Sequence, residues 1–180
     1  MAVKTITVEA FAKDKKISFG NIEHTITEAE ENAKKVTVAG IGTFDWTNDT
    51  DKATFVADST LSGEIGITTQ NTAKVLSADF SKAAAGIKFT GDASITSFTG
   101  GAGNDTLIGA DETTDINAGA GNDLVSLAAG ATQTTVTLGA GADTLDISAV
   151  TGNGNNKVFD YNYFEGDVIK VVNGDSVTLN

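Results

Sequence analysis

The stretch GGAGNDTLIG, residues 100–109, belongs to a pattern that repeats every nine residues. Reading forward in nines gives GGAGNDTLI, GADETTDIN and AGAGNDLVS, and reading backward gives GDASITSFT, KAAAGIKFT and AKVLSADFS. The eighth residue of each unit is large and apolar, and in chain order these residues are Phe80, Phe89, Phe98, Leu107, Ile116 and Val125. A fixed period of this kind is the sequence signature of a repeat architecture.

The same apolar position continues, after short insertions, as Val136, Leu145, Val158 and Ile169. Nine residues suffice for one short strand and one glycine-rich turn, so two units would form one coil of a flattened solenoid with two parallel sheets. One sheet is expected to carry Phe80, Phe98, Ile116, Val136 and Val158, and the other Phe89, Leu107, Val125, Leu145 and Ile169. Helices are excluded here because each interior glycine costs about 1 kcal/mol.

The sequence therefore predicts an all-β protein, a right-handed parallel β-roll or β-helix solenoid, in three parts. Residues 73–172 are expected to form the roll. Residues 1–72 contain the alternating or branched segments TITV, ISF, VTV and ITT, which predict strand-rich N-terminal coils or a cap. Residues 173–180 are expected to be a C-terminal end or a truncation.

The charge balance limits the partners. The chain has 24 acidic residues against 12 basic ones, a net charge of −12, which argues against nucleic acid and anionic membranes and favours cations. No apolar run approaches the roughly 18 residues of a membrane helix, so membrane insertion is not expected. With no cysteine and a single histidine, a zinc site built on thiolates or several imidazoles is excluded.

Three units, GGAGNDTLI, AGAGNDLVS and LGAGADTLD, share two glycines and an aspartate in register. They fit the nonapeptide G-G-x-G-x-D-x-U-x, in which U is a large apolar residue. The chain thus resembles the RTX, or haemolysin-type, calcium-binding repeats of secreted bacterial proteins. The leading glycine is replaced by Ala118 in the second unit and by Leu138 in the third.

The spacing of the aspartates has a physical reason. Calcium requires six to eight oxygen ligands, from carboxylates and backbone carbonyls, so one turn cannot surround the ion and the next coil must complete the shell. Turns on one side of the solenoid should recur about every 18 residues, and aspartates follow one another at intervals of 18, 20 and 24 residues: Asp105, Asp123, Asp143 and Asp167. By the resemblance, they are accompanied by the carbonyls of Gly101, Gly103, Gly119, Gly121, Gly139 and Gly141.

A calcium column is therefore expected on one edge only. Ions are predicted between the turns of Asp105 and Asp123 and between those of Asp123 and Asp143, with a third conceivable near Asp167. On the other edge, Thr114 and Asn156 stand where aspartates would be.

Catalysis has little support in the sequence. A phosphate loop would need Lys followed by Ser or Thr after the glycines, and no HExxH, histidine-containing triad or G-x-S-x-G is present, so the chain is not expected to be an enzyme. The sequence favours a calcium-binding structural module of a secreted or cell-surface bacterial protein. By the resemblance, it would be exported by a type I system and fold on calcium outside the cell. The alternatives are an adhesin or surface-layer module with a carbohydrate or cell-surface ligand, or a glycan-active β-helix enzyme.

Overall fold

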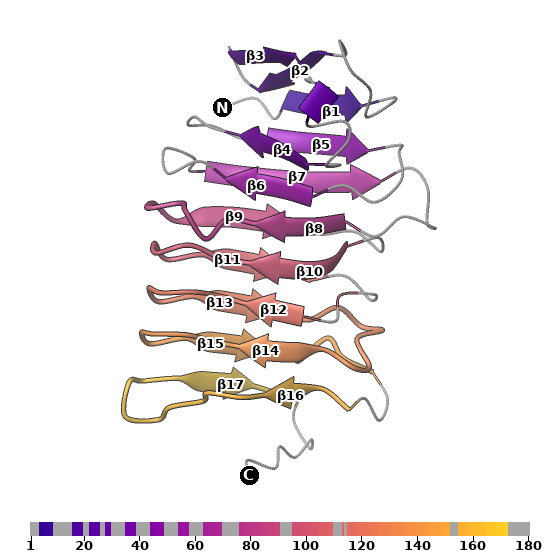
Figure 1. The fold of residues 1–180 in the computed structure, drawn as a ribbon. Helices are drawn as coiled ribbons and strands as arrows, with labels where there is room; N and C mark the ends of the chain where they lie inside the picture. Colours follow the sequence, from indigo (N-terminus) through magenta and orange to yellow (C-terminus); the bar gives the residue numbers. More distant parts are fainter. Residues whose placement is uncertain are drawn as a thin grey trace.

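The chain forms a stack of coils, seen in a computed structural model (Figure 1). The residues that the structure describes are 4–8, 16–19, 22–25, 28–29, 35–38, 44–48, 54–57, 63–69, 76–90, 95–109, 113, 115–151 and 155–172. Among them, no helix is long and apolar enough to cross a membrane.

Alternate strands build two parallel sheets, which confirms the expected all-β parallel solenoid. The first sheet contains, in spatial order, β1 (Lys4–Val8), β5 (Phe44–Asn48), β7 (Gly63–Thr69), β9 (Ile87–Thr90), β11 (Thr106–Ile108), β13 (Leu124–Ser126), β15 (Thr144–Asp146) and β17 (Val168–Lys170). The second contains β4 (Lys35–Val38), β6 (Thr54–Ala57), β8 (Leu76–Asp79), β10 (Ile95–Thr99), β12 (Asp115–Asn117), β14 (Thr135–Thr137) and β16 (Lys157–Val158).

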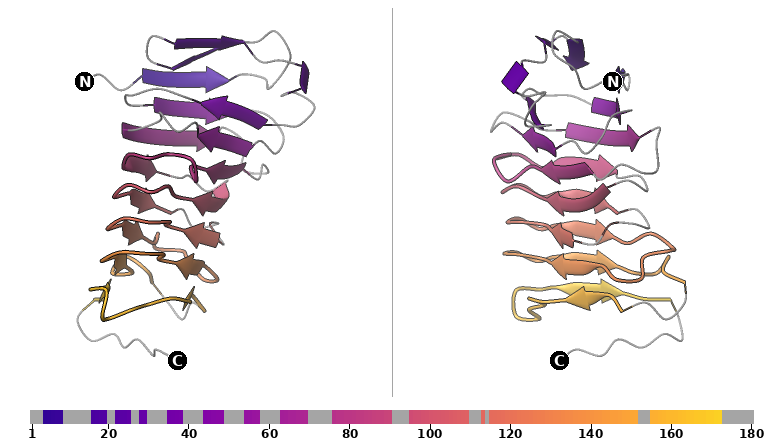
Figure 2. Two further views of the ribbon diagram at one scale, coloured as in Figure 1. Left: turned by 60° about the vertical axis from the view of Figure 1, so that its left-hand side comes forward. Right: turned by 45° about the vertical axis from the view of Figure 1, so that its right-hand side comes forward.

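Five strands of the N-terminal part, β1, β4, β5, β6 and β7, belong to the same two sheets. β7 pairs with β9, placing Ile65 opposite Phe89, and β6 pairs with β8, placing Phe55 opposite Ala78. The parallel pairing therefore runs across residue 72 without a break. At the N-terminal end, β2 (Lys16–Phe19) and β3 (Ile22–Thr25) form an antiparallel pair next to β1 (Figure 2). Residues 173–180 lie outside the described part.

The nine-residue register places the core as expected in the first sheet. The mutual partners there are, in order, Phe89, Leu107, Val125, Leu145 and Ile169. Each of the three-residue strands β11, β13 and β15 buries its central side chain and leaves both neighbours partly exposed. This alternation is the period of two that a strand imposes on its side chains. The apolar eighth residue is thus what holds successive coils in register.

The second sheet departs from expectation at one residue. Phe98, Ile116, Val136 and Val158 pair as predicted, but the partner of Phe98 in β8 is Ala78, not Phe80. The offset from Phe80 is two residues, and a register shift between Ile95 and Ser97 in β10 accounts for one of them. Phe80 follows β8 and donates its N–H to the carbonyl of Thr99. It begins a separate buried column whose other members are Gly100, Ala118 and Leu138.

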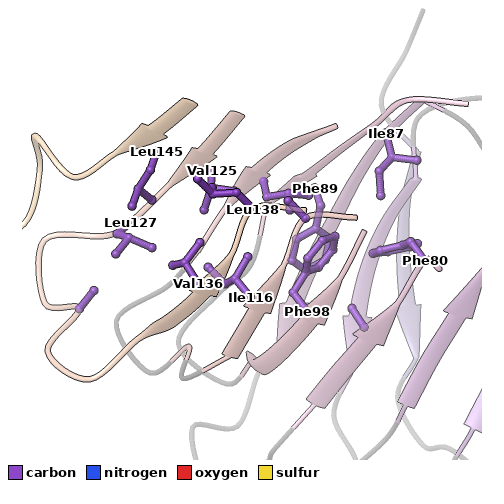
Figure 3. Packing of buried hydrophobic residues seen from close by; sticks show 14 of the residues in the cluster. Phe80, Ile87, Phe89, Phe98, Ile116, Val125, Leu127, Val136, Leu138 and Leu145 are labelled. Atoms are coloured by element: carbon purple, nitrogen blue, oxygen red, sulfur yellow. The ribbon is translucent and has the colours of Figure 1, made fainter. Parts of the chain in front are cut away.

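Three phenylalanine rings fill the interior where these columns meet (Figure 3). The ring centroids of Phe80 lie 5.5 Å from Phe89 and 5.2 Å from Phe98, and those of Phe89 and Phe98 are stacked at 4.5 Å. These are favourable separations for aromatic pairs. Towards the C-terminus the core becomes aliphatic, with Ile116, Val125, Val136, Leu138 and Leu145 buried. This core is a firm support for the turns at its sides.

The two edges of the solenoid differ in the lengths of their turns. Turns 100–105, 118–123 and 138–143 lead from the second sheet into the first and are all equally long, whereas the last turn of that edge, 159–167, is longer. We call these four turns the aspartate edge; it lies at the left of Figure 1. On the opposite edge, the connections 109–114, 127–134 and 147–156 lengthen along the chain. The insertions within residues 127–156 therefore fall on one side.

A candidate cation site along the aspartate edge

Four aspartates stack in one buried column. Asp105, Asp123, Asp143 and Asp167 each end a turn of the aspartate edge, two residues before a core residue of the first sheet. Their exposed fractions are only 2%, 2%, 0% and 3%. The structure thus brings the four predicted aspartates together on one edge.

Each carboxylate is hydrogen-bonded to the coil before it. Its Oδ1 accepts the backbone N–H of the corresponding residue one coil earlier: Asp105 from Ile87 at 2.9 Å, Asp123 from Asp105 at 2.7 Å, Asp143 from Asp123 at 2.8 Å and Asp167 from Asp143 at 2.9 Å. Hydrogen bonds to a charged acceptor are roughly twice as strong as neutral ones. The column therefore clamps successive coils together.

The hydrogen bonding of the second carboxylate oxygen, Oδ2, differs between the two ends of the column and its middle. At the ends, Oδ2 of Asp105 accepts the N–H of Gly101 at 2.9 Å, and Oδ2 of Asp167 accepts that of Asn162 at 2.7 Å. In the middle, Oδ2 of Asp123 and Oδ2 of Asp143 are buried and accept no hydrogen bond. A buried carboxylate oxygen without a partner is costly. Among the carboxylate oxygens of the column, these two are therefore the acceptors without a partner.

The pKa values of three aspartates in the column are raised. Burial raises the pKa of Asp123 to about 7, and the negative charges of Asp105 and Asp143 add to the increase. Burial likewise raises the pKa of Asp105, and that of Asp143, where the carboxylates of Asp167, Asp160 and Glu165 contribute as well. The column therefore contains negative charge that its hydrogen bonds do not compensate.

Glycines let the middle turns stack backbone against backbone. Gly119 and Gly121 have φ values of 105° and 123°, and Gly139 and Gly141 have values of 97° and 139°, a region that side-chain-bearing residues rarely adopt. A Cβ on Gly139 would overlap the carbonyl oxygen of Gly119, and one on Gly141 that of Gly121. Carbonyl oxygens of one turn thus lie directly against the next turn.

The six predicted glycine carbonyls are not equivalent. Those of Gly101 and Gly119 accept the N–H groups of Ala120 and Ala140 at 2.9 and 3.0 Å. Within the described residues, the other four accept no backbone N–H: Gly103, Gly121, Gly139 and Gly141. The turn 100–105 also lacks a positive-φ glycine. Turns 118–123 and 138–143 therefore form the most complete oxygen-rich site.

Side chains alone would not hold a metal here. In the described part of the chain, no three Asp, Glu or His side chains are grouped closely enough to bind one. A cation in the column would take most of its ligands from glycine carbonyls. Such a mixed set, all oxygen and without nitrogen or sulfur, is the donor chemistry that calcium prefers.

Asn104 and Asn122 have a role that the sequence did not reveal. Oδ1 of Asn104 accepts the N–H of Asn122 at 2.8 Å, and Oδ1 of Asn122 accepts the N–H of Ala142 at 2.9 Å. These bonds reach to the following coil, whereas the adjacent aspartates reach to the preceding one. Each of these turns is therefore tied to both of its neighbours.

On the opposite edge, an uncharged side chain makes the same kind of hydrogen bond to the preceding coil. Oδ1 of Asn156 accepts the N–H of Thr134 at 2.8 Å, its Nδ2 donates to the carbonyl of Ala131 at 2.9 Å, and the Thr134 hydroxyl donates to the carbonyl of Thr113 at 2.8 Å. These polar groups satisfy one another within the protein. Thr114 lies outside the described residues.

Comparison with known proteins adds no relative: no protein-family model matches the chain, and neither characterised proteins nor solved structures give a match.

The raised pKa values predict how the stability of the cation-free protein depends on pH. The pKa of Asp123 is about 7 in the folded chain against 3.8 ordinarily, so the folded state binds this proton more tightly than the unfolded state. In chelator, the free energy of unfolding should therefore fall as the pH rises from about 4 to about 7. Circular dichroism in chelator measures this as a folded fraction that is larger at pH 5 than at pH 7.5. Asp123→Asn should flatten the dependence, and a parent protein whose stability rises over this interval would contradict the prediction.

Proposed function

We propose that the chain is a calcium-binding structural β-roll module of a secreted or cell-surface protein. The observation that carries the proposal is the pair of buried, unpartnered Oδ2 atoms of Asp123 and Asp143. They belong to turns whose positive-φ glycines place carbonyl oxygens against the next turn. The nonapeptide resemblance to RTX repeats supports the same assignment from the sequence.

Calcium fits this donor set better than other common ions. It accepts six to eight oxygens in variable geometry, whereas magnesium requires a near-ideal octahedron and keeps several waters. Asp123 and Asp143, with the carbonyls of Gly121, Gly139 and Gly141, would hold one ion. Asp105 and Asp123, with the carbonyl of Gly103, would hold a second, less completely prepared one. Bound calcium would neutralise the buried carboxylates.

Ion binding would then be coupled to folding. A chain with a net charge of −12 and a column of buried carboxylates is self-repelling without cations. Because the coils that form the site do not exist in the unfolded chain, the free energy of calcium binding adds to the free energy of folding. Affinities of about 0.1–1 mM, as in extracellular modules, would leave the chain expanded inside a cell and folded outside.

Calcium titration followed by circular dichroism tests the proposal. In chelator at pH 7.5 we expect a largely unfolded spectrum, and at several millimolar calcium a β-sheet spectrum, with little response to the same concentration of magnesium. A parent protein with a complete strand signal in chelator and no change on adding calcium would refute the proposed function.

One observation also favours an adhesive role as a second candidate. On the second sheet, Thr99, Asn117 and Thr137 lie in register in adjacent strands. None of these side chains belongs to the buried core. They form a short ladder of hydroxyl and amide groups, the kind of surface that hydrogen-bonds carbohydrates. Calcium would stiffen the same scaffold in this case, so the two candidates share one mechanism of folding.

A further inference from the structure

At the start of successive turns, a backbone N–H group is hydrogen-bonded to the next coil. The N–H of Phe80 donates to the carbonyl of Thr99 at 2.7 Å, and the N–H of Gly100 to that of Asn117 at 2.7 Å. The N–H of Ala118 donates to the carbonyl of Thr137 at 2.9 Å. In every case the acceptor is a backbone carbonyl at the end of the next strand of the second sheet.

At the last coil a side chain replaces that carbonyl. The N–H of Phe159 still donates to the carbonyl of Val136 at 3.0 Å, but the chain then leaves the strand. Asp160 takes over: its Oδ1 accepts the N–H of Leu138 at 2.7 Å, and its Oδ2 accepts the N–H of Gly139, also at 2.7 Å. The carboxylate thus supplies two acceptors where the preceding coils use one backbone carbonyl.

The two bonds fix the beginning of the turn 138–143. Leu138 is fully buried, and Gly139 has a φ of 97°. Later in the turn, the N–H of Ala142 donates to Asn122 and that of Asp143 to Asp167. Asp160 and Asp167 therefore hold this turn from its outer side, the place that another repeat would occupy.

We infer that Asp160 is a positioning residue that ends the calcium column: by binding the Leu138 and Gly139 N–H groups in place of a further coil, it sets the geometry of the last cation-binding turn. This inference rests on the proposed function for its calcium readout. Asp160 is not assigned as a ligand, because it lies outside the column of Asp105, Asp123, Asp143 and Asp167 and its two oxygens hold the N–H groups at the start of the turn. Its role is to orient Gly139, whose carbonyl is one of those that accept no backbone N–H.

The test compares three variants of the full 180-residue chain. Asp160→Ala removes both acceptors. Asp160→Asn keeps the shape of the side chain but places an amide donor against one of the two N–H groups. Asp115→Ala is the matched control, because Asp115 is an exposed aspartate on β12 and its loss removes the same charge. Calcium binding is measured by calorimetry, and exchange of the Leu138 and Gly139 amide protons by NMR at several millimolar calcium.

For Asp160→Ala we expect calcium affinity at one site to fall by about 10- to 100-fold, while the site nearer Asp105 keeps its affinity. The Leu138 and Gly139 amides should exchange faster, Asp160→Asn should be intermediate, and Asp115→Ala should match the parent. Parental affinity in Asp160→Ala, or an equal loss at both sites, would overturn the inference. If the parent binds no calcium, the proposed function fails instead. In that case the Leu138 and Gly139 amide protons are still compared between the parent and Asp160→Asn. Equal exchange rates in the two proteins would refute the inference that Asp160 holds the turn.

Discussion

Asp123→Ala is expected to remove calcium from both middle positions of the aspartate edge and to leave the chain largely unfolded at millimolar calcium. Asp123 has two functions at once. Its Oδ1 accepts the N–H of Asp105, and its Oδ2 is one of the two buried oxygens without a partner. The substitution leaves the Asp105 N–H buried and unpaired, which costs about 1–3 kcal/mol. It also removes a carboxylate that both ions would share, so calcium affinity should fall by about 100-fold or more.

Asn156→Ala provides a matched control on the opposite edge. Asn156 also accepts an N–H one coil earlier, from Thr134, but carries no charge. Its loss should lower the free energy of unfolding by a comparable hydrogen-bond contribution without changing the calcium stoichiometry. Calorimetry and circular dichroism at matched calcium concentrations separate the two effects. Asp123→Ala protein that binds as many ions as the parent would show that the column is not the calcium site.

Gly139→Ala should lower the free energy of unfolding by about 3 kcal/mol or more, even with calcium present. Two costs add at this position. Its φ of 97° strains any residue that has a Cβ, and that Cβ would overlap the carbonyl oxygen of Gly119. Backbone atoms of the neighbouring turn cannot rotate away as a flexible side chain could. The turn must shift, which also moves the carbonyls proposed to bind calcium.

Substitutions at two other glycines distinguish the cost of backbone strain from the cost of the overlap. Gly166 has a φ of 101°, but its nearest neighbour would be the Ala142 methyl at 3.2 Å, so Gly166→Ala should cost about 1 kcal/mol, mainly from backbone strain. Gly109 has neither a positive φ nor a contact below 3.4 Å, so Gly109→Ala should be nearly neutral. Urea denaturation of the three variants measures the series. Equal losses at Gly139 and Gly109 would contradict the stacked-turn geometry.

The sequence predicted most of the architecture because one signal was strong. A large apolar residue every nine positions has only one efficient way to be buried, and the pairing of Phe89, Leu107 and Val125 follows directly from it. The prediction failed at Phe80, where the period continues in the sequence but not in space. Ala78, two residues earlier, takes its place in the column; a register shift in β10 accounts for one of these two residues, and the sequence carries no mark of it.

The candidate site was only partly predictable for a similar reason. Aspartates spaced by a full coil indicate a column, and the structure places them in one. The distinction between the middle and the ends of that column depends on which oxygen accepts which N–H, as at Asp105 and Asp123. Asp160 gave no signal at all, because its position in the repeat is occupied by apolar residues or glycine in earlier coils. Only the departure of the chain at Phe159 makes it an acceptor.

The unequal lengths of the two edges have a practical consequence. The equal turns 100–105, 118–123 and 138–143 stack backbone against backbone, so an extra residue in any of them would disturb the turn packed against it. The opposite connections 127–134 and 147–156 have already been lengthened, and the strands on either side of them keep their register. A foreign peptide grafted there would be presented along one side of a rigid rod. Such a graft would lie on the side of the solenoid away from the proposed calcium column.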